Sequence, residues 1–252
     1  MEIVRFRSAN SSKFGKIEKD KIVEIINFSF GSVNFEYGNT FEKSNHELLC
    51  PLCPSKIVGI ALNNEKLVGK KESYEEPLIF LKSPTSITSK KNIEIPNFDC
   101  KVWVEAEIGI VISKKGKNIK KSSAKDYIFG HIIANDLTMD NLYGRDHHLG
   151  RSKSLDNFCP ISKYIHTNVE TENLFIKTQI NGKNYQDGNS SDRILNDYEC
   201  IELVSKFITL EEGDLILTGT VENALNCVVK NNDEIKMEIE NLGELSHKIV
   251  LK

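Results

Sequence analysis

This sequence has no apolar run that approaches 18 residues, so it contains no segment expected to cross a membrane as a helix. Its first residues, Met-Glu-Ile-Val-Arg-Phe, also lack the layout of a signal peptide. Basic residues form no band, because 33 lysines and arginines are interspersed with 36 acidic residues and the net charge is -3. A nucleic-acid-binding protein usually concentrates its basic residues on one face. These absences predict a soluble, cytoplasmic protein with no membrane or nucleic-acid partner.

Cysteine pairs are equally scarce. Of six cysteines, only Cys50 and Cys53 stand close together, as Cys-Pro-Leu-Cys. A structural zinc site needs a second pair of ligands at similar spacing, and the sequence has none. Isolated cysteines in a cytosolic protein are usually small, reduced core residues. We therefore expect neither zinc nor redox use of this pair.

Helical periodicity is rare, whereas short strand-like segments recur along the chain. The clearest helix is predicted over residues 198–208, with Asp197 as its N-cap. Residues 234–240 and 245–250 predict a hairpin that turns about residues 241–243. Few β-α-β units and no internal repeats occur. The sequence therefore predicts a β-rich mixed α+β fold with few short helices.

The chain length is compatible with one main domain and a small appendage. We predict a small N-terminal β appendage over residues 1–48 and a main domain over residues 49–252. The elements expected in the appendage are strands at residues 3–6 and 21–26, a turn around Gly15, and a loop from residue 28 to residue 45 with a short helix near its end.

Two glutamates interrupt an apolar segment at residues 101–112. Glu105 and Glu107 alternate with valine, alanine and isoleucine side chains, which is the period of a half-buried strand. Both carboxylates would point to the same side of that strand, roughly 6 to 7 Å apart. No lysine or arginine lies between Val102 and Ser113 to neutralise them. The pair has two interpretations: a solvated outer face, or part of a cation site.

A third carboxylate favours the cation site. Asp136 closes the segment 127–136, in which both faces of the expected strand are mostly apolar, so this strand should be buried. A buried aspartate needs a partner, and a metal ion is one. Oxygen ligands favour Mg²⁺, Mn²⁺ or Ca²⁺ over zinc, and three carboxylates leave positions for water and a chelating substrate. We predict a divalent-metal site at Glu105, Glu107 and Asp136.

Two polar segments are candidates for the walls of an active site. Residues 63–77 are charged, have no apolar repeat and lie between two expected strands, which is compatible with a mobile lid. Residues 140–160 form an expected loop that is dense in functional groups, including Arg145, His147 and Lys153. Loops of this kind beside a metal strand often carry binding residues.

Several short motifs follow one another along most of the chain. They are Glu105-Ala-Glu107, Ala134-Asn-Asp136, Lys153-Ser-Leu-Asp156 with Pro160, Ile180-Asn-Gly182, Gln186-Asp-Gly188, residues 213–220, and Gly243-Glu-Leu245. In this order and spacing the chain resembles the fumarylacetoacetate hydrolase family, in the small single-domain form common in bacteria and archaea. The resemblance runs from about Lys56 to Val250.

The resemblance implies roles for particular residues. Glu105, Glu107 and Asp136 would bind Mg²⁺ or Mn²⁺, Lys153 would contact the substrate near the metal, and Thr220 would help to hold a carboxylate or keto oxygen. It also implies a β-roll with a mixed sheet, and usually a homodimer. Members of the family act on acylpyruvates, oxaloacetate and dienoic 2-oxo acids as hydrolases, decarboxylases, isomerases or hydratases.

Three positions depart from the pattern of the hydrolases in that family. Where those enzymes usually carry a histidine and a glutamate that activate water, this chain has Leu67 and Lys70, and where an arginine commonly follows the Asn-Asp pair it has Asp140. Substitutes are conceivable among the acids of the lid and the basic residues of the following loop. These candidates are Glu65, Glu72, Glu75 and Glu76 as a base, and Arg145, His147 and His148 in place of the arginine.

These observations favour a metal-dependent enzyme that enolises, isomerises or decarboxylates a small 2-oxo acid, because such reactions need mainly an electrophilic metal. Lys153 is the predicted catalytic residue, and Thr220, Arg145 and His147 are predicted to bind the substrate. Two alternatives remain open. The protein could be a carbon-carbon bond hydrolase of the acylpyruvate type that uses recruited lid residues, or a degenerate member that binds a metal or carboxylate without turnover.

Overall fold

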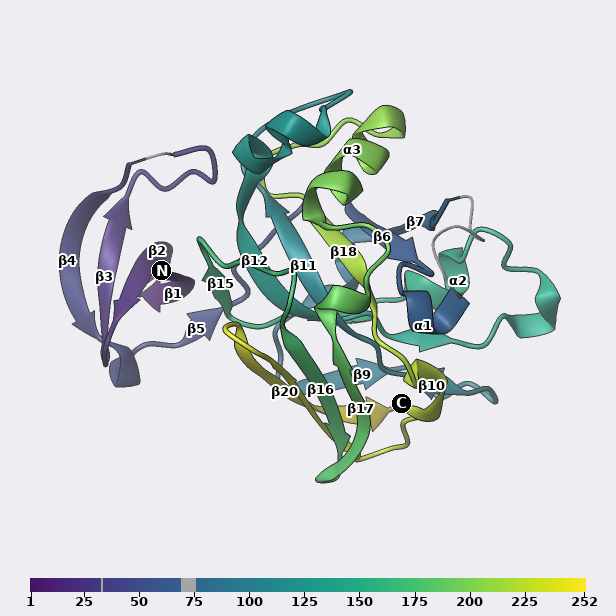
Figure 1. The fold of residues 1–252 in the computed structure, drawn as a ribbon. Coiled ribbons are helices and arrows are strands. Elements are labelled where there is room, and N and C mark those ends of the chain that lie inside the picture. Colours follow the sequence, from purple (N-terminus) through teal and green to yellow (C-terminus); the bar gives the residue numbers. More distant parts are fainter. Residues whose placement is uncertain (33, 69–75) are drawn as a thin grey trace.

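The computed structural model describes residues 1–32, 34–68 and 76–252. Within these ranges the chain is built mainly of strands, with a few short helices at the edges of the sheets (Figure 1). The predicted β-rich α+β fold is confirmed. No described helix has the length and apolar composition needed to span a bilayer. All six cysteines carry free thiols, and Cys159, Cys200 and Cys227 are buried.

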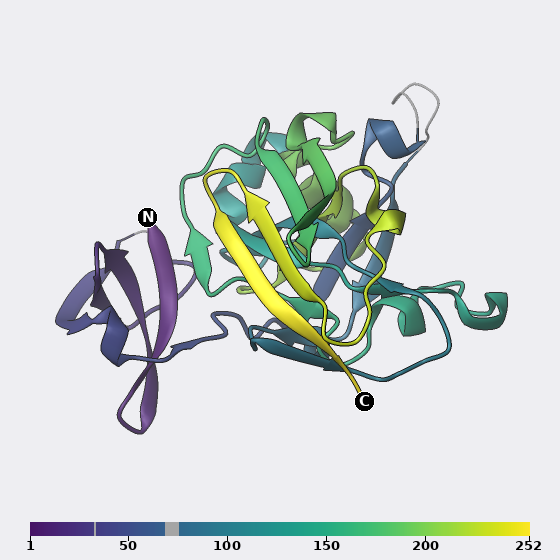
Figure 2. The same cartoon turned by 90° about the horizontal axis from the view of Figure 1, so that it is seen from below.

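The N-terminal strands form an antiparallel group at the left of Figures 1 and 2, and residues 2–4 join it to the main body by pairing with residues 164–166. Its elements are β1 (Glu2–Ser8), β2 (Ser11–Glu18), β3 (Lys21–Ile26), β4 (Glu36–Glu42), η1 (Lys43–Asn45) and β5 (Leu48–Leu49). The division of the chain at residue 48 stays a prediction.

Two expectations for this segment are wrong. Gly15 lies inside β2, paired with Val4 and Glu24, and forms no turn. A Cβ atom at this position would come within 2.5 Å of Ile22 Cγ2, so glycine serves close packing of the strands here. The expected loop at residues 28–45 contains β4, which has no apolar alternation because most of its residues are exposed.

The main sheet runs in the order β4-β3-β2-β1-β15-β12-β11-β18-β6-β7, with β5 paired to β1. The strands of its second half are β6 (Ile57–Ala61), β7 (Leu78–Lys82), β11 (Ala106–Ile112), β12 (Ile128–Asn135), β15 (Tyr164–His166) and β18 (Leu215–Thr220). Strand β11 is buried along its whole length, because its residues belong to three different apolar clusters.

A smaller sheet covers part of β11 and β12, as Figure 2 shows from below. Its order is β17-β16-β19-β20-β9, and the predicted C-terminal hairpin is its β19–β20 pair. Two strand pairs, β10–β13 and β8–β14, complete the described sheets. The bounds are β8 (Ile87–Thr88), β9 (Asn92–Ile95), β10 (Val102–Trp103), β13 (Thr138–Met139), β14 (Cys159–Pro160), β16 (Phe175–Ile180), β17 (Lys183–Asn189), β19 (Glu234–Ile239) and β20 (Gly243–Leu251).

The longest described helix, α3 (Asp197–Phe207), packs its apolar side on β11 and β18. Its N-cap is Asn196 and not the predicted Asp197, because the Asn196 side chain accepts from the backbone of Glu199 in a capping box. Asp197 instead pairs with His131 and Arg193. The remaining helices among the described residues are α1 (Glu65–Val68), α2 (Gly150–Lys153), η3 (Pro84–Ser86), η4 (Lys121–Tyr127), η5 (Leu142–Gly144), η6 (Ser190–Asp192) and η7 (Ala224–Asn226).

Candidate metal centre

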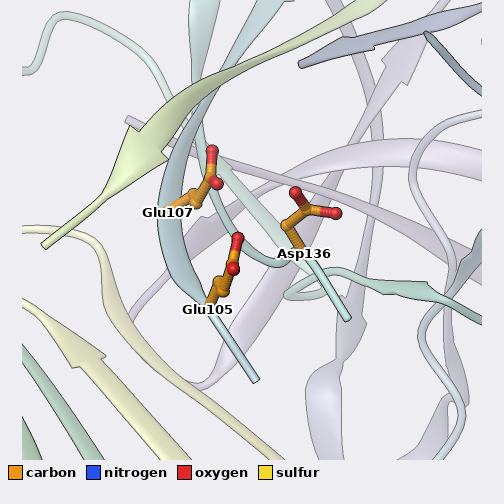
Figure 3. A group of neighbouring side chains, drawn as sticks. All are labelled: Glu105, Glu107 and Asp136. Atoms are coloured by element: carbon orange, nitrogen blue, oxygen red, sulfur yellow. The ribbon is translucent and has the colours of Figure 1, made fainter. Parts of the chain in front are cut away.

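The structure brings the three predicted ligands together. Glu107 lies in β11, Glu105 just before β11, and Asp136 just after β12, its antiparallel neighbour. One carboxylate oxygen from each residue lies within 4.8 Å of the other two. Figure 3 shows the three side chains pointing into the same space. The spacing is suited to ligands of a single ion.

The local backbone differs from the expectation of one continuous, half-buried strand. The chain leaves the ladder at residues 104 and 105, between β10 and β11. Here the amide of Val104 donates to the Cys227 carbonyl oxygen, and the amide of Glu105 donates to Asn135 Oδ1 at 3.1 Å. This break turns Glu105 toward Asp136. Glu107 is buried rather than half-exposed, with 3% of its surface accessible.

Two lysines supply positive charge to the carboxylates. Lys153 Nζ, at the end of α2, donates to Glu105 Oε2 at 2.8 Å and to Asp136 Oδ2 at 2.6 Å. Lys82 Nζ, at the end of β7, donates to Asp136 Oδ1 and to the Leu137 carbonyl oxygen. The Lys82 side chain is fully buried. Both oxygens of Asp136 therefore carry a charge-assisted hydrogen bond.

Lys82 was not among the site residues predicted from the sequence. The available signal was strand alternation, because Lys82 is two residues from Phe80 and shares its inward face in β7. A lysine on the apolar face of a strand requires a buried acid as partner. Asp136 is that acid.

Two further hydrogen bonds orient the glutamates. Trp103 Nε1 donates to Glu105 Oε1 at 2.6 Å. The backbone amide of Gly219 donates to Glu107 Oε2 at 2.7 Å. Gly219 has φ +91°, a conformation that glycine adopts readily. The other oxygen of Glu107 accepts no hydrogen bond from any described residue, so it is available to a cation.

The three carboxylates do not titrate alike. Burial, reinforced by the nearby charges of Asp136 and Glu105, raises the pKa of Glu107 well above its ordinary value. Burial also opposes the charge of Asp136, but Lys153 and Lys82 outweigh it and lower the pKa of that carboxyl. For Lys153, burial is outweighed by Asp136 and Glu105, which raise the pKa of its ammonium group. Without a metal ion, Glu107 thus tends to keep its proton, and a divalent cation would displace it.

Behind the carboxylates, Asn135 links Glu105 to the small sheet. Its Nδ2 group lies 3.0 Å from His247 Nε2, and its Oδ1 accepts from the Glu105 amide. The contact requires an unprotonated nitrogen on His247, since the amide group is the donor. Burial lowers the pKa of His247 to about 4, so this histidine is neutral near pH 7.

A cavity of about 640 Å³ opens beside the carboxylates. Its polar end is formed by Glu105, Glu107, Asp136, Lys153 and Thr220. Its other walls carry mainly apolar side chains, among them Leu62, Leu67, Met139, Leu149 and Leu225. The volume falls within the usual range for sites that bind small molecules.

The other predicted site residues are placed differently. Thr220 lines the cavity, where its hydroxyl donates to the Ala106 carbonyl oxygen at 3.1 Å. Arg145 and His147 are exposed on the loop between β13 and α2, which projects at the right of Figure 1. Neither belongs to the lining of the cavity, and His148, on the same loop, does not either. Substrate binding by Arg145 and His147 stays a prediction.

The structure describes some of the positions at which the sequence departs from the hydrolases of the family. Leu67, in α1, lines the cavity, whereas Lys70 lies outside the described residues. Asp140 accepts a hydrogen bond from the Lys101 amide at 2.9 Å and does not line the cavity. Of the proposed replacement bases, Glu65 and Glu76 lie outside the cavity lining, and Glu72 and Glu75 lie outside the described residues.

A second cavity, of about 360 Å³, lies by the N-terminal end of α3. Its lining includes His131 and Asp197, whose side chains are 2.8 Å apart. Asp197 also accepts from Arg193 Nη1 at 2.7 Å and from the Thr171 hydroxyl at 2.5 Å. These contacts saturate the carboxylate and join α3 to β12, so the pair has a structural role.

Comparison with known proteins gives consistent results. Residues 56–250 match the family model described as fumarylacetoacetate (FAA) hydrolase C-terminal. The chain is 35% identical over 231 residues to uncharacterized protein MJ1656 of Methanocaldococcus jannaschii, covering 90% of this chain and 93% of that protein. It is 34% identical over 224 residues to the mitochondrial oxaloacetate tautomerase fahd2 of Xenopus laevis, covering 82% and 70%.

Solved structures share the whole fold. A 2-hydroxyhepta-2,4-diene-1,7-dioate isomerase from Mycobacterium marinum has a TM-score of 0.90 at 31% identity, with 100% of this chain and 99% of that chain covered. A maleylpyruvate hydrolase from Sphingobium sp. SYK-6, in complex with manganese(II) and pyruvate, has a TM-score of 0.78 at 22% identity, with 100% and 99% covered. At that identity the likeness concerns the fold alone.

Proposed function

This chain belongs to the fumarylacetoacetate hydrolase family, and from that premise we propose that it is a divalent-metal-dependent enzyme that enolises, isomerises or decarboxylates a small 2-oxo acid. The observation that carries the proposal is the joint position of Glu105, Glu107, Asp136 and Lys153 at the polar end of one cavity. The donor set fits the proposed ion, because hard oxygen ligands suit Mg²⁺ or Mn²⁺ and one Glu107 oxygen accepts no hydrogen bond from a described residue.

The residues of the site match the chemistry of a 2-oxo acid. When bound, Mg²⁺ or Mn²⁺ would supply a Lewis acid for the substrate's carboxylate and keto oxygens. Lys153 would add a fixed positive charge beside the oxygen on which an enolate develops, and its raised pKa keeps it protonated. Thr220 lines the same cavity, and its hydroxyl would have to exchange its hydrogen bond to the Ala106 carbonyl oxygen for one to the substrate.

The residues on the lid side favour reactions without an activated water. Leu67 lines the cavity at the position where hydrolases of the family carry an acid-base residue. Apart from the three carboxylates and Lys153, no described residue of the cavity lining has an ionisable side chain. Proton transfer within a 2-oxo acid, or loss of carbon dioxide from one, needs charge stabilisation at the enolate oxygen more than a water nucleophile.

The relatives support this choice in part. One relative that matches most of this chain is an oxaloacetate tautomerase, and one solved neighbour is a dienedioate isomerase. Both names describe rearrangement of an oxo or enol acid. The complex of maleylpyruvate hydrolase with manganese(II) and pyruvate is an example of the shared fold with a divalent ion bound to it.

One assay tests the proposal. Purified protein is treated with EDTA, reloaded with Mg²⁺ or Mn²⁺, and offered oxaloacetate, an acylpyruvate and a dienoic 2-oxo acid. We expect metal-dependent changes in enol absorbance or release of carbon dioxide, without cleavage of the acylpyruvate. Formation of pyruvate and a free acid from the acylpyruvate would refute the proposal in favour of the hydrolase alternative. Metal binding without any turnover would identify a non-catalytic member.

A pair of variants tests the assignment of the ligands. Glu107→Gln should abolish the metal-dependent reaction, because an amide cannot replace the anionic ligand. Glu94→Gln is the matched control, since Glu94 is exposed in β9 and outside the cavity. Full activity of Glu107→Gln would refute the assignment.

A further inference from the structure

The cavity beside the carboxylates has two chemically different ends. The three acids and Lys153 cluster together, whereas the rest of the described lining is mainly apolar and includes four leucines, Leu62, Leu67, Leu149 and Leu225, beside a few neutral polar side chains. Three of them are exposed to a degree that is unfavourable for leucine, with accessible fractions of 40% for Leu62, 42% for Leu67 and 72% for Leu225. Apolar side chains gathered around one cavity are typical of a binding site for an apolar group.

Two of these leucines have unfavourable backbone conformations. Leu62 has φ +62° and Leu149 has φ +57°, in the left-handed region that penalises residues with a bulky side chain. The chain uses asparagine at eight of the thirteen non-glycine positions with positive φ among the described residues. Leucine at two positions that face the same cavity therefore points to a function for these side chains.

The charges in the cavity lead to the same conclusion. Lys153 is the one lysine or arginine among the described residues that line it. Its ammonium group is already shared by Glu105 and Asp136. A second carboxylate at the far end of a bound acid would meet leucines and the neutral amides of Asn141, Asn223 and Asn226, but no second cation among the described residues of the lining. Burying a carboxylate without a counter-ion is costly.

We infer that the substrate is a monocarboxylic 2-oxo acid with an uncharged, apolar group, alkyl or aryl, at the end remote from its carboxylate. The inference rests on the proposed function, which places the 2-oxo carboxylate at the polar end. The apolar group then contacts Leu62, Leu67, Leu149 and Leu225. A dicarboxylic acid such as oxaloacetate fits the polar end equally well but leaves its second carboxylate unpaired.

The test compares phenylpyruvate with oxaloacetate. Both have a tautomerisation in which a proton leaves C3 and the C2 oxygen gains one, so enol absorbance follows both reactions. Binding of each acid to the Mn²⁺-loaded protein is measured in parallel by titration calorimetry. Burial of an aryl group should favour phenylpyruvate by about tenfold to hundredfold in affinity and in kcat/KM.

Variants at the apolar end change the substrate preference without replacing a metal ligand. Leu225→Lys adds a cation at an exposed position and should shift the preference toward oxaloacetate by at least about tenfold. Leu81→Lys is the matched control, because Leu81 is 50% exposed and lies outside the cavity lining. Leu62→Asn should leave the thermal midpoint unchanged or raise it, because asparagine tolerates positive φ, while it weakens binding of phenylpyruvate.

The outcomes separate the two proposals. Tighter binding of phenylpyruvate, reversed by Leu225→Lys and unaffected by Leu81→Lys, supports the inference whether or not the acids are turned over. Absence of turnover for every acid would refute only the proposed function. Metal-dependent turnover with oxaloacetate preferred over phenylpyruvate overturns the inference and leaves the proposed function intact. Unchanged phenylpyruvate binding in Leu62→Asn also overturns the inference for that leucine.

Discussion

Replacing Lys82 by methionine should destabilise the metal-free protein more than the metal-loaded one. Lys82 and Asp136 both have fully buried side chains, and they form an ion pair. Removing one partner of a buried pair typically costs about 3 to 5 kcal/mol, because the other charge is left uncompensated. Asp136 keeps its 2.6 Å contact with Lys153, so we expect a loss near the lower limit, about 3 kcal/mol.

A metal ion should return part of this loss. The freed Asp136 oxygen increases the negative charge that faces a cation, so metal affinity should rise on the order of tenfold, which corresponds to about 1.4 kcal/mol of added stabilisation at saturation. The assay is urea unfolding of the wild type and the variant, once in EDTA and once in saturating Mg²⁺. The difference in unfolding free energy between the two proteins should be smaller in Mg²⁺.

Lys56→Met is the matched control. Lys56 pairs with Asp214, whose side chain is also fully buried, but this pair lies at the other end of β18 from Thr220. Its loss should be the same with and without metal. A cost below about 1 kcal/mol for Lys82→Met, or a cost independent of metal in both variants, would refute the reasoning.

Three further predictions concern the same centre. Because the pKa of Glu107 is raised, the metal-free fold holds a proton on this carboxyl, and the stability of the metal-free protein should fall as pH rises above the ordinary pKa of 4.5. Metal binding should then release this proton. Calorimetry in two buffers should detect the release, and Glu107→Gln should abolish it. Burial lowers the pKa of His247 from 6.5 to about 4, so the free energy of unfolding should fall by about 3 kcal/mol as pH decreases through that range. Urea unfolding of the wild type and of His247→Gln at several pH values checks this. An equal dependence of the unfolding free energy on pH in both proteins would contradict it. Trp103→Phe removes the 2.6 Å hydrogen bond to Glu105 and should weaken Mn²⁺ binding by about tenfold to hundredfold in a calorimetric titration, whereas unchanged affinity would rule out a positioning role.

The sequence was most informative where side-chain alternation and burial coincide. Strand β3 and the β19–β20 hairpin follow from their apolar periods. The three carboxylates could be grouped because Asp136 ends a segment with two apolar faces, which makes an uncompensated charge improbable there.

Other features depend on contacts between distant residues and have no local signal. The polar edge strand β4 carries no apolar period, and Gly15 is required by a neighbouring strand rather than by a turn. Asn196 and Asp197 are both good N-cap residues, and the choice between them is made by the partners His131 and Arg193. The break before Glu105 likewise depends on Asn135 and Cys227.

The single tryptophan of the chain has a practical consequence. Its indole group donates directly to Glu105, so any ion or acid that enters the centre alters the surroundings of the molecule's sole indole fluorophore. The emission of the unmodified protein is therefore an intrinsic optical reporter of occupancy, and equilibrium titrations or stopped-flow traces at this centre need no attached dye.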